Sequence, residues 1–223
     1  MTNREKAKEI VKILIKRYGA KPPLYLKYNK NKPYEFLFAV MMSAQCTDER
    51  VNIVTKDLYK KYDSLIKFAN AKREELEMDI HSVGFYHNKA KSIINAAKKL
   101  ITDYDSKVPN DFDDLLTLPG VGRKTASVVI GTLYGKPAMA VDTHVARISN
   151  ILFKLNTKDV RIIEEKLKEI IEKKYWNLWN THIIALGREI CIARRPKCDI
   201  CPLYKLCKGT SKKSYLSDKK NRG

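Results

Sequence analysis

Helical periodicity runs through almost the whole chain and is the feature that most restricts how the chain can fold. From residue 3 to residue 18, apolar residues recur at the spacing of one helix face, and the pattern stops at Gly19, a residue type that often follows a helix end. No segment shows the alternation of polar and apolar residues that is typical of a half-buried strand. The sequence therefore predicts an all-α fold.

The predicted helices are separated by short turns that contain glycine or proline. They cover residues 3–18, 33–44, 49–62, 64–69, 72–80, 88–104, 111–118, 123–134, 143–155, 158–173 and 177–190. No internal repeat of fixed period is found. After the first helix, Pro22 and Pro23 predict an extended link.

The charge of the chain indicates an anionic partner. Forty-four Lys and Arg residues against 25 Asp and Glu residues give a net charge of +19, which attracts polyanions and speeds their capture. Nucleic acid is the favoured partner; a membrane surface, or basicity that serves only solubility, is the alternative. The first residues lack the apolar core that is typical of a signal peptide, and no run of about 18 apolar residues that would span a membrane is found. We therefore expect a cytoplasmic protein that associates with the nucleoid through DNA.

The segment 115–125, which reads LLTLPGVGRKT, predicts a tight hairpin between two helices. Gly120 and Gly122 permit positive φ and leave no side chain over the turn. Successive backbone N–H groups can then point outward at the positive end of the second helix, where a DNA phosphate would bind. Gly-x-Gly also occurs as an ordinary turn between helices. The flanking helices, the net charge and the Arg123-Lys124 pair favour the phosphate site.

Four cysteines close to the C-terminus predict a metal centre. Cys191, Cys198, Cys201 and Cys207 form the pattern C-x6-C-x2-C-x5-C, and in a reducing compartment such a group indicates metal ligands and not a disulfide framework. The spacing by itself slightly favours zinc, although only one pair has the C-x2-C spacing of a zinc finger. Cys46 lies far upstream and is expected to be a buried or half-buried thiol.

The segments LPGVGRKTASVV and AVDTHVAR resemble the helix-hairpin-helix DNA glycosylases, and most closely the endonuclease III family. The resemblance extends from about residue 33 to Cys207. It implies a six-helix domain over residues 26–136, with the helix-hairpin-helix at about 111–134. A second domain would combine residues 1–25 with residues 137–211, and DNA would cross the cleft between the two. Residues 212–223 would form a flexible basic tail.

The resemblance implies that Lys124 is a catalytic nucleophile. A neutral amine attacks C1′ of the sugar, displaces the base and forms a Schiff base that permits β-elimination. The first turn of a helix disfavours a cation, and burial in a cleft would act in the same direction. Relatives that carry a non-amine at this position remove a base without cutting the strand.

The resemblance also implies a catalytic role for Asp142, which would accept a proton and stabilise the positive charge that develops on the sugar. An aspartate directly before a helix is most often an N-cap, and the two roles are compatible. A carboxylate close to Lys124 would favour the protonated amine, against the effects of the helix dipole and burial. The sequence does not decide which effect prevails.

For the four cysteines the resemblance implies a 4Fe–4S cluster, because their spacing matches the cluster loop of the family. Arg194, Arg195 and Lys197 lie between the first two ligands and would bind phosphate from a loop that the cluster holds rigid. The cluster would then organise DNA binding and take no part in the chemistry.

Further DNA-binding positions follow from matches to the family. Gln45 matches a polar side chain that enters the space left by the extruded nucleotide. Phe85 matches an apolar wedge beside the opposite strand, although a core aromatic is an equal alternative. Asp48 and His144 would line the pocket, whereas a lone histidine is more often structural. Leu118, with the hairpin glycines and Arg123, would contact the DNA backbone.

The predicted function is a base-excision-repair DNA glycosylase and abasic-site (AP) lyase that acts on oxidised pyrimidines and abasic sites in double-stranded DNA. The sequence leaves two alternatives open. One is a monofunctional or mismatch-directed glycosylase, which Lys124 disfavours. The other is a non-catalytic DNA-binding module with a structural metal. No coiled-coil pattern is present, and a monomer is expected.

Overall fold

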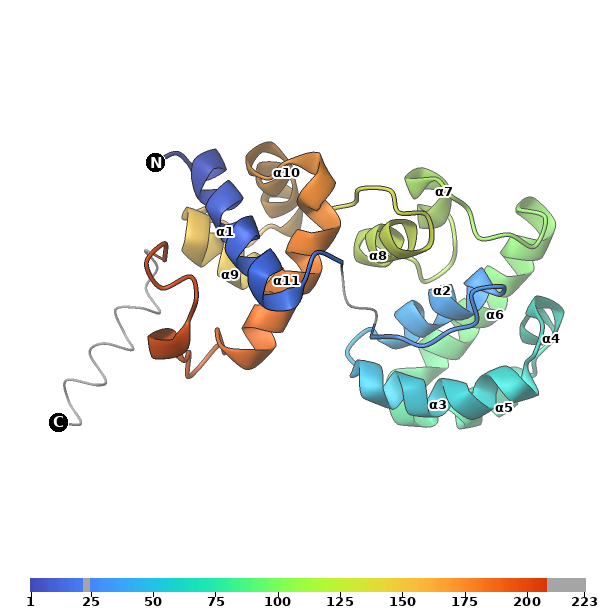
Figure 1. Cartoon of the computed structure of the whole chain (residues 1–223). Helices are drawn as coiled ribbons and strands as arrows, with labels where there is room; N and C mark the ends of the chain where they lie inside the picture. Colours follow the sequence, from blue (N-terminus) through green and yellow to red (C-terminus); the bar gives the residue numbers. More distant parts are fainter. Residues whose placement is uncertain (22–24, 208–223) are drawn as a thin grey trace. The chain divides into compact units, whose positions relative to one another are not determined.

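The computed structural model describes residues 1–21 and 25–207, and within them every regular element is helical (Figure 1). The all-α prediction is confirmed. The described residues fall into two compact units. Unit 1 contains residues 1–21 and 137–207, and unit 2 contains residues 25–136. The basic tail predicted at 212–223 lies outside the described residues.

Unit 2 is built around one central helix, α2 (Pro33–Met42). Its other elements are α3 (Asp48–Lys61), α4 (Leu65–Ala69), α5 (Arg73–Ile80), the 3-10 turn η1 (His81–Val83), α6 (Tyr86–Asp103), α7 (Phe112–Leu116) and α8 (Arg123–Leu133). Helix α2 is apolar on nearly all sides, and every residue from Tyr34 to Met42 is buried. A helix of that kind must be covered on all faces, and α3, α6 and α8 pack against it.

Unit 1 joins the first helix to the last part of the described chain. Its elements are α1 (Asn3–Tyr18), α9 (Thr143–Phe153), α10 (Val160–Ile170), the 3-10 turn η2 (Lys173–Tyr175), α11 (Trp176–Glu189) and the 3-10 turn η3 (Cys198–Ile200). Ile10 and Leu14 of α1 are buried in a core with Trp179 of α11. The amine of Lys6, also buried, donates a hydrogen bond to the carbonyl of Leu152.

The predicted helices are all present, and the differences lie at their ends. Helix α1 has the predicted bounds because Thr2 forms a capping box with Glu5 and because Gly19 has φ +92°. Helix α6 begins two residues earlier than predicted, after Phe85 in a left-handed conformation. The 3-10 turns were not predicted. None of the helices in the described part of the chain has both the length and the apolarity that a bilayer span requires.

Candidate nucleic-acid interface and metal centre

The two glycines of the hairpin between α7 and α8 differ in backbone conformation and in the space around them. Gly120 has φ +80°, and a Cβ atom there would lie 2.6 Å from Cβ of Ser92. Gly122 has an extended backbone with φ −97°, and a Cβ atom there would meet no atom of the described chain within 4 Å. Both glycines were expected to permit positive φ, and only Gly120 adopts it. Nothing in the described part of the chain requires a glycine at that position.

Two side chains of the hairpin differ in their exposure. Leu118 is buried, so its side chain belongs to the core of unit 2, and only its backbone could take part in the DNA contact that was predicted for it. Arg123 is exposed, and its guanidinium lies 5.0 Å from the ring centre of Phe112 on α7. This cation–π contact gives the arginine a defined place beside the turn.

Lys124 is the second residue of α8 and is exposed. It lies in the first turn of α8, directly after the hairpin. The burial that was expected for its side chain is not provided by unit 2. An exposed amine at this position is accessible to a large substrate.

Asp142 is the N-cap of α9. Its Oδ1 atom accepts a hydrogen bond of 2.8 Å from the backbone N–H of Val145, so the capping role is confirmed. Its side chain is half-buried, and among the described residues no donor to Oδ2 is found. One carboxylate oxygen is thus fixed by the helix, and the other is available for chemistry.

Two asparagines of α11 hold the segment that leads to Asp142. The buried Asn180 donates a hydrogen bond of 2.8 Å to the carbonyl of Ala140. Asn177 accepts a hydrogen bond of 3.0 Å from the N–H of Ala138. Their spacing of three residues puts both on one face of the helix. Neither role was predicted from the sequence, because side-chain bonds to a distant backbone leave no local pattern.

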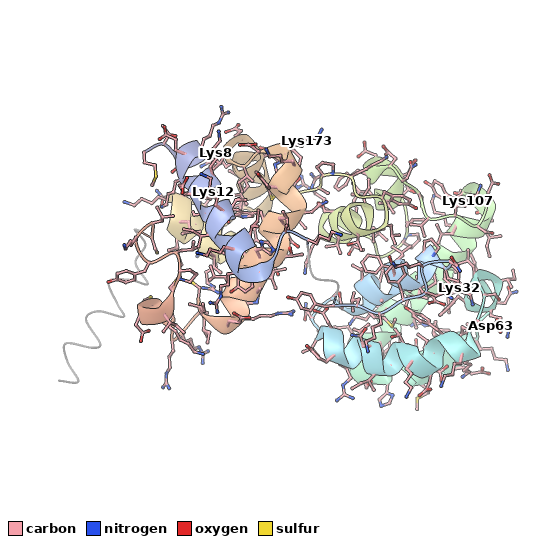
Figure 2. All side chains as sticks on the ribbon, in the orientation of Figure 1. Lys8, Lys12, Lys32, Asp63, Lys107 and Lys173 are labelled. Atoms are coloured by element: carbon pink, nitrogen blue, oxygen red, sulfur yellow. The ribbon has the colours of Figure 1, made fainter. Side chains whose placement is uncertain are left out.

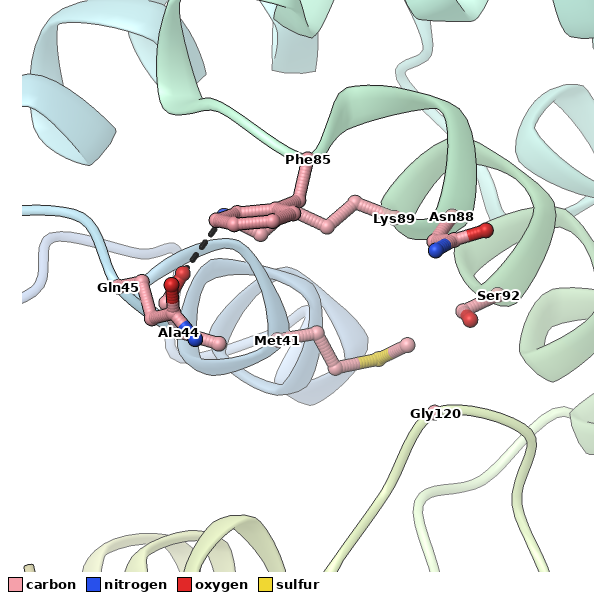
Figure 3. A pocket seen from close by; sticks show the side chains of 8 residues that line it. All are labelled: Met41, Ala44, Gln45, Phe85, Asn88, Lys89, Ser92 and Gly120. Carbon is pink, nitrogen blue, oxygen red and sulfur yellow. Dashed lines mark hydrogen bonds between the residues drawn. The ribbon is translucent and has the colours of Figure 1, made fainter.

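Gln45 and Phe85 are exposed and have left-handed backbones, with φ of 55° and 48°. Phe85 is 66% exposed, so the alternative of a core aromatic is wrong. Non-glycine residues with positive φ cost about 1–3 kcal/mol each, and such strain is often found at functional sites. Both residues line a surface hollow together with Met41, Ala44, Asn88, Lys89, Ser92 and Gly120 (Figure 3).

The two predicted pocket residues are half-buried. Asp48 is the first residue of α3, which Thr47 caps. His144 lies against α11, because a Cβ atom at Gly187 would be 2.5 Å from the Nδ1 atom of this histidine. His144 therefore has a structural contact, and glycine at 187 leaves the space for its ring.

The four predicted metal ligands surround one cavity. Cys191, Cys198, Cys201 and Cys207 line it together with Ile151, Ile190, Pro196, Lys197 and Tyr204. Within the described residues, no three His, Cys, Asp or Glu side chains converge tightly enough for a single metal ion. A cavity lined by four cysteines fits a metal cofactor with thiolate ligands.

The four cysteines of this cavity are half-buried. Burial raises the pKa of Cys201 to about 11 and that of Cys191 above its ordinary value, because it disfavours the thiolate. Nη1 of Arg147 lies 3.6 Å from the Sγ atom of Cys191 and acts in the opposite direction. Arg147 alone does not balance four thiolates, and a bound metal centre would supply the positive charge that stabilises them. The donor set therefore fits a metal cofactor.

The loop between the first two cysteines presents basic side chains to solvent. Arg194, Arg195 and Lys197 are exposed, whereas Pro196 between them is buried. The backbone N–H of Lys197 also bonds to the carbonyl of Ile190. Exposed lysines occur on both units, for example Lys173 and Lys107 (Figure 2), so the net positive charge is available to a polyanion.

Comparisons with known proteins agree with this arrangement. A family model for HhH-GPD superfamily base excision DNA repair proteins matches residues 38–173. A model for the iron–sulfur binding domain of endonuclease III matches residues 191–207. The second match begins and ends at cysteines, and it decides for iron–sulfur between the two metals that the cysteine spacing left open.

Individual relatives cover nearly the whole chain. Endonuclease III of Bacillus subtilis (strain 168) is 45% identical over 184 residues, which are 82% of this chain and 84% of the relative. Endonuclease III of Synechocystis sp. (strain ATCC 27184 / PCC 6803 / Kazusa) is 42% identical over 207 residues, 92% of this chain and 93% of the relative. The solved structure of a trapped endonuclease III–DNA covalent intermediate, an estranged-adenine complex, is 40% identical and superposes with a TM-score of 0.89, covering 97% of this chain and 100% of that one. The chain belongs to the endonuclease III family of base-excision DNA repair proteins, and it is a DNA-binding glycosylase and AP lyase with a 4Fe–4S cluster.

Proposed function

We propose that Lys124 is the nucleophile of both activities. Its neutral Nζ forms a bond to C1′ of the damaged nucleotide as the bond from C1′ to the base breaks, and the base leaves with the bonding electrons and takes up a proton. The bonded nitrogen then loses a proton, and its lone pair forms a C1′=N iminium as the C1′–O4′ bond of the sugar ring breaks and O4′ takes up a proton. The iminium acidifies the proton on C2′. Loss of that proton expels the 3′ phosphate and cuts the strand. The observation that carries this proposal is an exposed amine in the first turn of α8, directly after the glycine hairpin.

Asp142 is proposed to assist Lys124 through its second carboxylate oxygen. The N-cap bond to Val145 fixes the orientation of the carboxylate, and a fixed negative charge stabilises the positive charge that develops on the sugar without reorganisation. The same carboxylate is suited to accept the proton that the amine loses when it forms the new bond.

The hairpin is proposed to bind one DNA phosphate through the backbone N–H groups around Gly120 and Gly122. The open space beside Gly122 supports this, because a phosphate needs close access to the backbone. Arg123 lies beside the same turn. Arg194, Arg195 and Lys197 provide a second basic group for the DNA backbone, which fixes the register of the protein without reading sequence.

The substrate is proposed to be an oxidised pyrimidine or an abasic site in double-stranded DNA, bound by a monomer. Gln45 and Phe85 enter the duplex when the damaged nucleotide leaves the stack, a step that costs a few kcal/mol. Their exposure and their left-handed backbones support this role. Asp48 and His144 are the candidates for lining the lesion pocket.

Cys191, Cys198, Cys201 and Cys207 are the proposed ligands of the cluster. When bound, the cluster supplies a rigid cross-link between the ends of the 191–207 segment. The chain's own part is to hold the basic loop: the bond from Lys197 to Ile190 and the buried Pro196 fix its backbone.

Reductive trapping tests the proposed chemistry. The protein is mixed with a duplex that contains one abasic site, and borohydride is added to reduce the Schiff base to a stable amine. We expect a covalent protein–DNA species, with peptide mapping that locates the adduct on Lys124. A trapped adduct on any other amine would contradict the proposal.

Phe85→Ala is expected to lower the single-turnover rate of base excision from duplex DNA by about 10-fold, because a stacking side chain contributes about 1–3 kcal/mol. The melting temperature should not change, since the ring is exposed. The control is Ile66→Ala, which removes another exposed apolar side chain, from α4. Equal rates in the two variants would refute the role of Phe85 in the duplex.

Cys201→Ser is expected to remove the cluster, because structural metal binding is coupled to the folding of its site. Iron analysis should fall from four atoms per chain to near zero, the visible absorption should vanish, and the affinity for DNA should fall as the basic loop loses its support. Cys46→Ser is the matched control, since Cys46 is half-buried and lies outside the cavity. Full iron content in Cys201→Ser would exclude Cys201 as a ligand.

A further inference from the structure

A buried lysine in unit 2 bonds to the two loops that carry Gln45 and Phe85. Lys89 lies in the first turns of α6 and is only 8% exposed. Its Nζ atom donates hydrogen bonds to the carbonyls of Met42 and Ala44, both at 2.8 Å, and to the carbonyl of Val83 at 2.9 Å. An ammonium group has three N–H donors, and all three are used.

The three carbonyls come from two separate segments. Met42 is the last residue of α2, and Ala44 directly precedes Gln45. Val83 is the last residue of η1 and lies two positions before Phe85. Figure 3 shows Lys89 reaching Ala44, with Gln45 and Phe85 on either side of this bond. The Lys89 amine therefore connects the two loops through carbonyls that lie one to three positions before Gln45 or Phe85.

The energetics of this connection are those of a buried charge with a full set of partners. Burial lowers the pKa of Lys89, while the nearby Cys46 raises it. The carbonyl end of α2 carries the negative end of that helix's dipole, which stabilises a cation. Without the amine, each of the three carbonyls would lose one hydrogen bond, and the backbones of both loops would lose their common support.

The two loops need such a support because their tips are strained. Gln45 and Phe85 each hold a left-handed backbone, which a non-glycine residue keeps only where its surroundings determine it. A polar and an aromatic side chain that enter one duplex together must also keep a fixed separation.

We propose that Lys89 is a positioning residue that joins the Gln45 and Phe85 loops and sets the spacing at which the two side chains enter DNA. This inference rests on the proposed roles of Gln45 and Phe85. Lys89 touches neither the substrate nor the reacting atoms. Its effect should therefore be confined to extrusion of the nucleotide from a duplex and should spare the chemistry of Lys124.

The test compares Lys89→Met with wild type on two substrates. On a duplex that contains thymine glycol, the single-turnover excision rate should fall about 100-fold, as expected when inserted groups are misplaced by about 1 Å. On a single-stranded oligonucleotide with an abasic site, which has no stack to open, incision should be unchanged. The matched control is Lys98→Met, an exposed lysine of the same helix, which should match wild type on both. Equal losses on both substrates, or no loss on the duplex, would overturn the proposal.

A second measurement separates positioning from general stability. In the Gln45→Ala/Phe85→Ala background, adding Lys89→Met should lower duplex excision by no more than about 2-fold, because residues that act through one another are not additive. A full further loss would show that Lys89 acts elsewhere. Thermal melting checks folding first. If Lys89→Met does not fold, Lys89→Gln is taken through the same comparisons, and failure of both to fold counts against a role confined to the loops.

Failure of this inference can be distinguished from failure of the proposed chemistry. A 2-aminopurine placed next to the lesion brightens when the stack opens, and this signal can be followed in the Lys124→Ala background without any reaction. Lys89→Met should abolish the brightening there. If wild type forms no adduct on Lys124 but the brightening still depends on Lys89, the nucleophile is wrong and the positioning role stands.

Discussion

Lys124→Ala is expected to abolish borohydride trapping and to lower the rate of strand incision by at least about 10⁴-fold, the scale of loss seen when a covalent nucleophile is removed. The reason is that both steps proceed through one bond between Nζ and C1′. Without that bond there is no iminium, and the C2′ proton stays too weakly acidic for elimination. Gel analysis of duplex DNA with one abasic site measures both trapping and incision.

DNA binding by Lys124→Ala should stay within about 2-fold of wild type, because one exposed lysine contributes little to phosphate neutralisation in a chain of net charge +19. The control is Lys107→Ala, which removes the same charge from another exposed position of unit 2 and should keep full activity. If Lys124→Ala incised abasic DNA at more than a small fraction of the wild-type rate, another amine would have to be the nucleophile.

Gly120→Ala is expected to destabilise unit 2 by about 3 kcal/mol, as the sum of left-handed strain and overpacking. Alanine at φ +80° is strained whatever the space around it, and its Cβ would lie 2.6 Å from Cβ of Ser92 and 3.1 Å from the tip of Met41. Met41 is flexible and can yield, but Cβ of Ser92 is fixed by the backbone of α6. Thermal and urea unfolding would show the loss, and activity should fall with it.

The neighbouring glycine provides a matched comparison. Gly122→Ala should leave stability unchanged or raise it by about 0.5 kcal/mol, since φ −97° suits alanine and the space is open. Its affinity for DNA should nevertheless fall about 10-fold, because the added methyl group would occupy the position proposed for a phosphate. Unchanged affinity in Gly122→Ala would argue against a phosphate at this turn.

The helices could be predicted because their signals are local. Thr2, Glu5 and Gly19 mark both ends of α1 within the residues they cap, and the apolar stripe between them recurs with the period of one helix face. Short 3-10 turns such as His81–Val83 have no such period, and tertiary packing determines them.

The candidate site was predicted where chemistry depends on residue type at a fixed spacing. The four cysteines and the 118–124 hairpin are of this kind. Features that follow from how helices pack were not predicted. They are the exposure of Phe85, the core position of Leu118 and the different conformations of Gly120 and Gly122. Lys89 is the extreme case. It is one of 44 basic residues. What distinguishes it is its hydrogen bonds, which include those to Met42 and Ala44, 47 and 45 positions away in the sequence.

The composition of unit 1 from both ends of the chain has a consequence for synthesis on the ribosome. Helix α1 emerges first, yet α9 and α11, which bury Ile10 and Leu14, follow only after all of unit 2 has been translated. At ribosomal elongation rates this delay is on the order of ten seconds. During that time α1 presents an unpartnered apolar stripe to solvent, so nascent chains should depend on chaperones until the last helices are made.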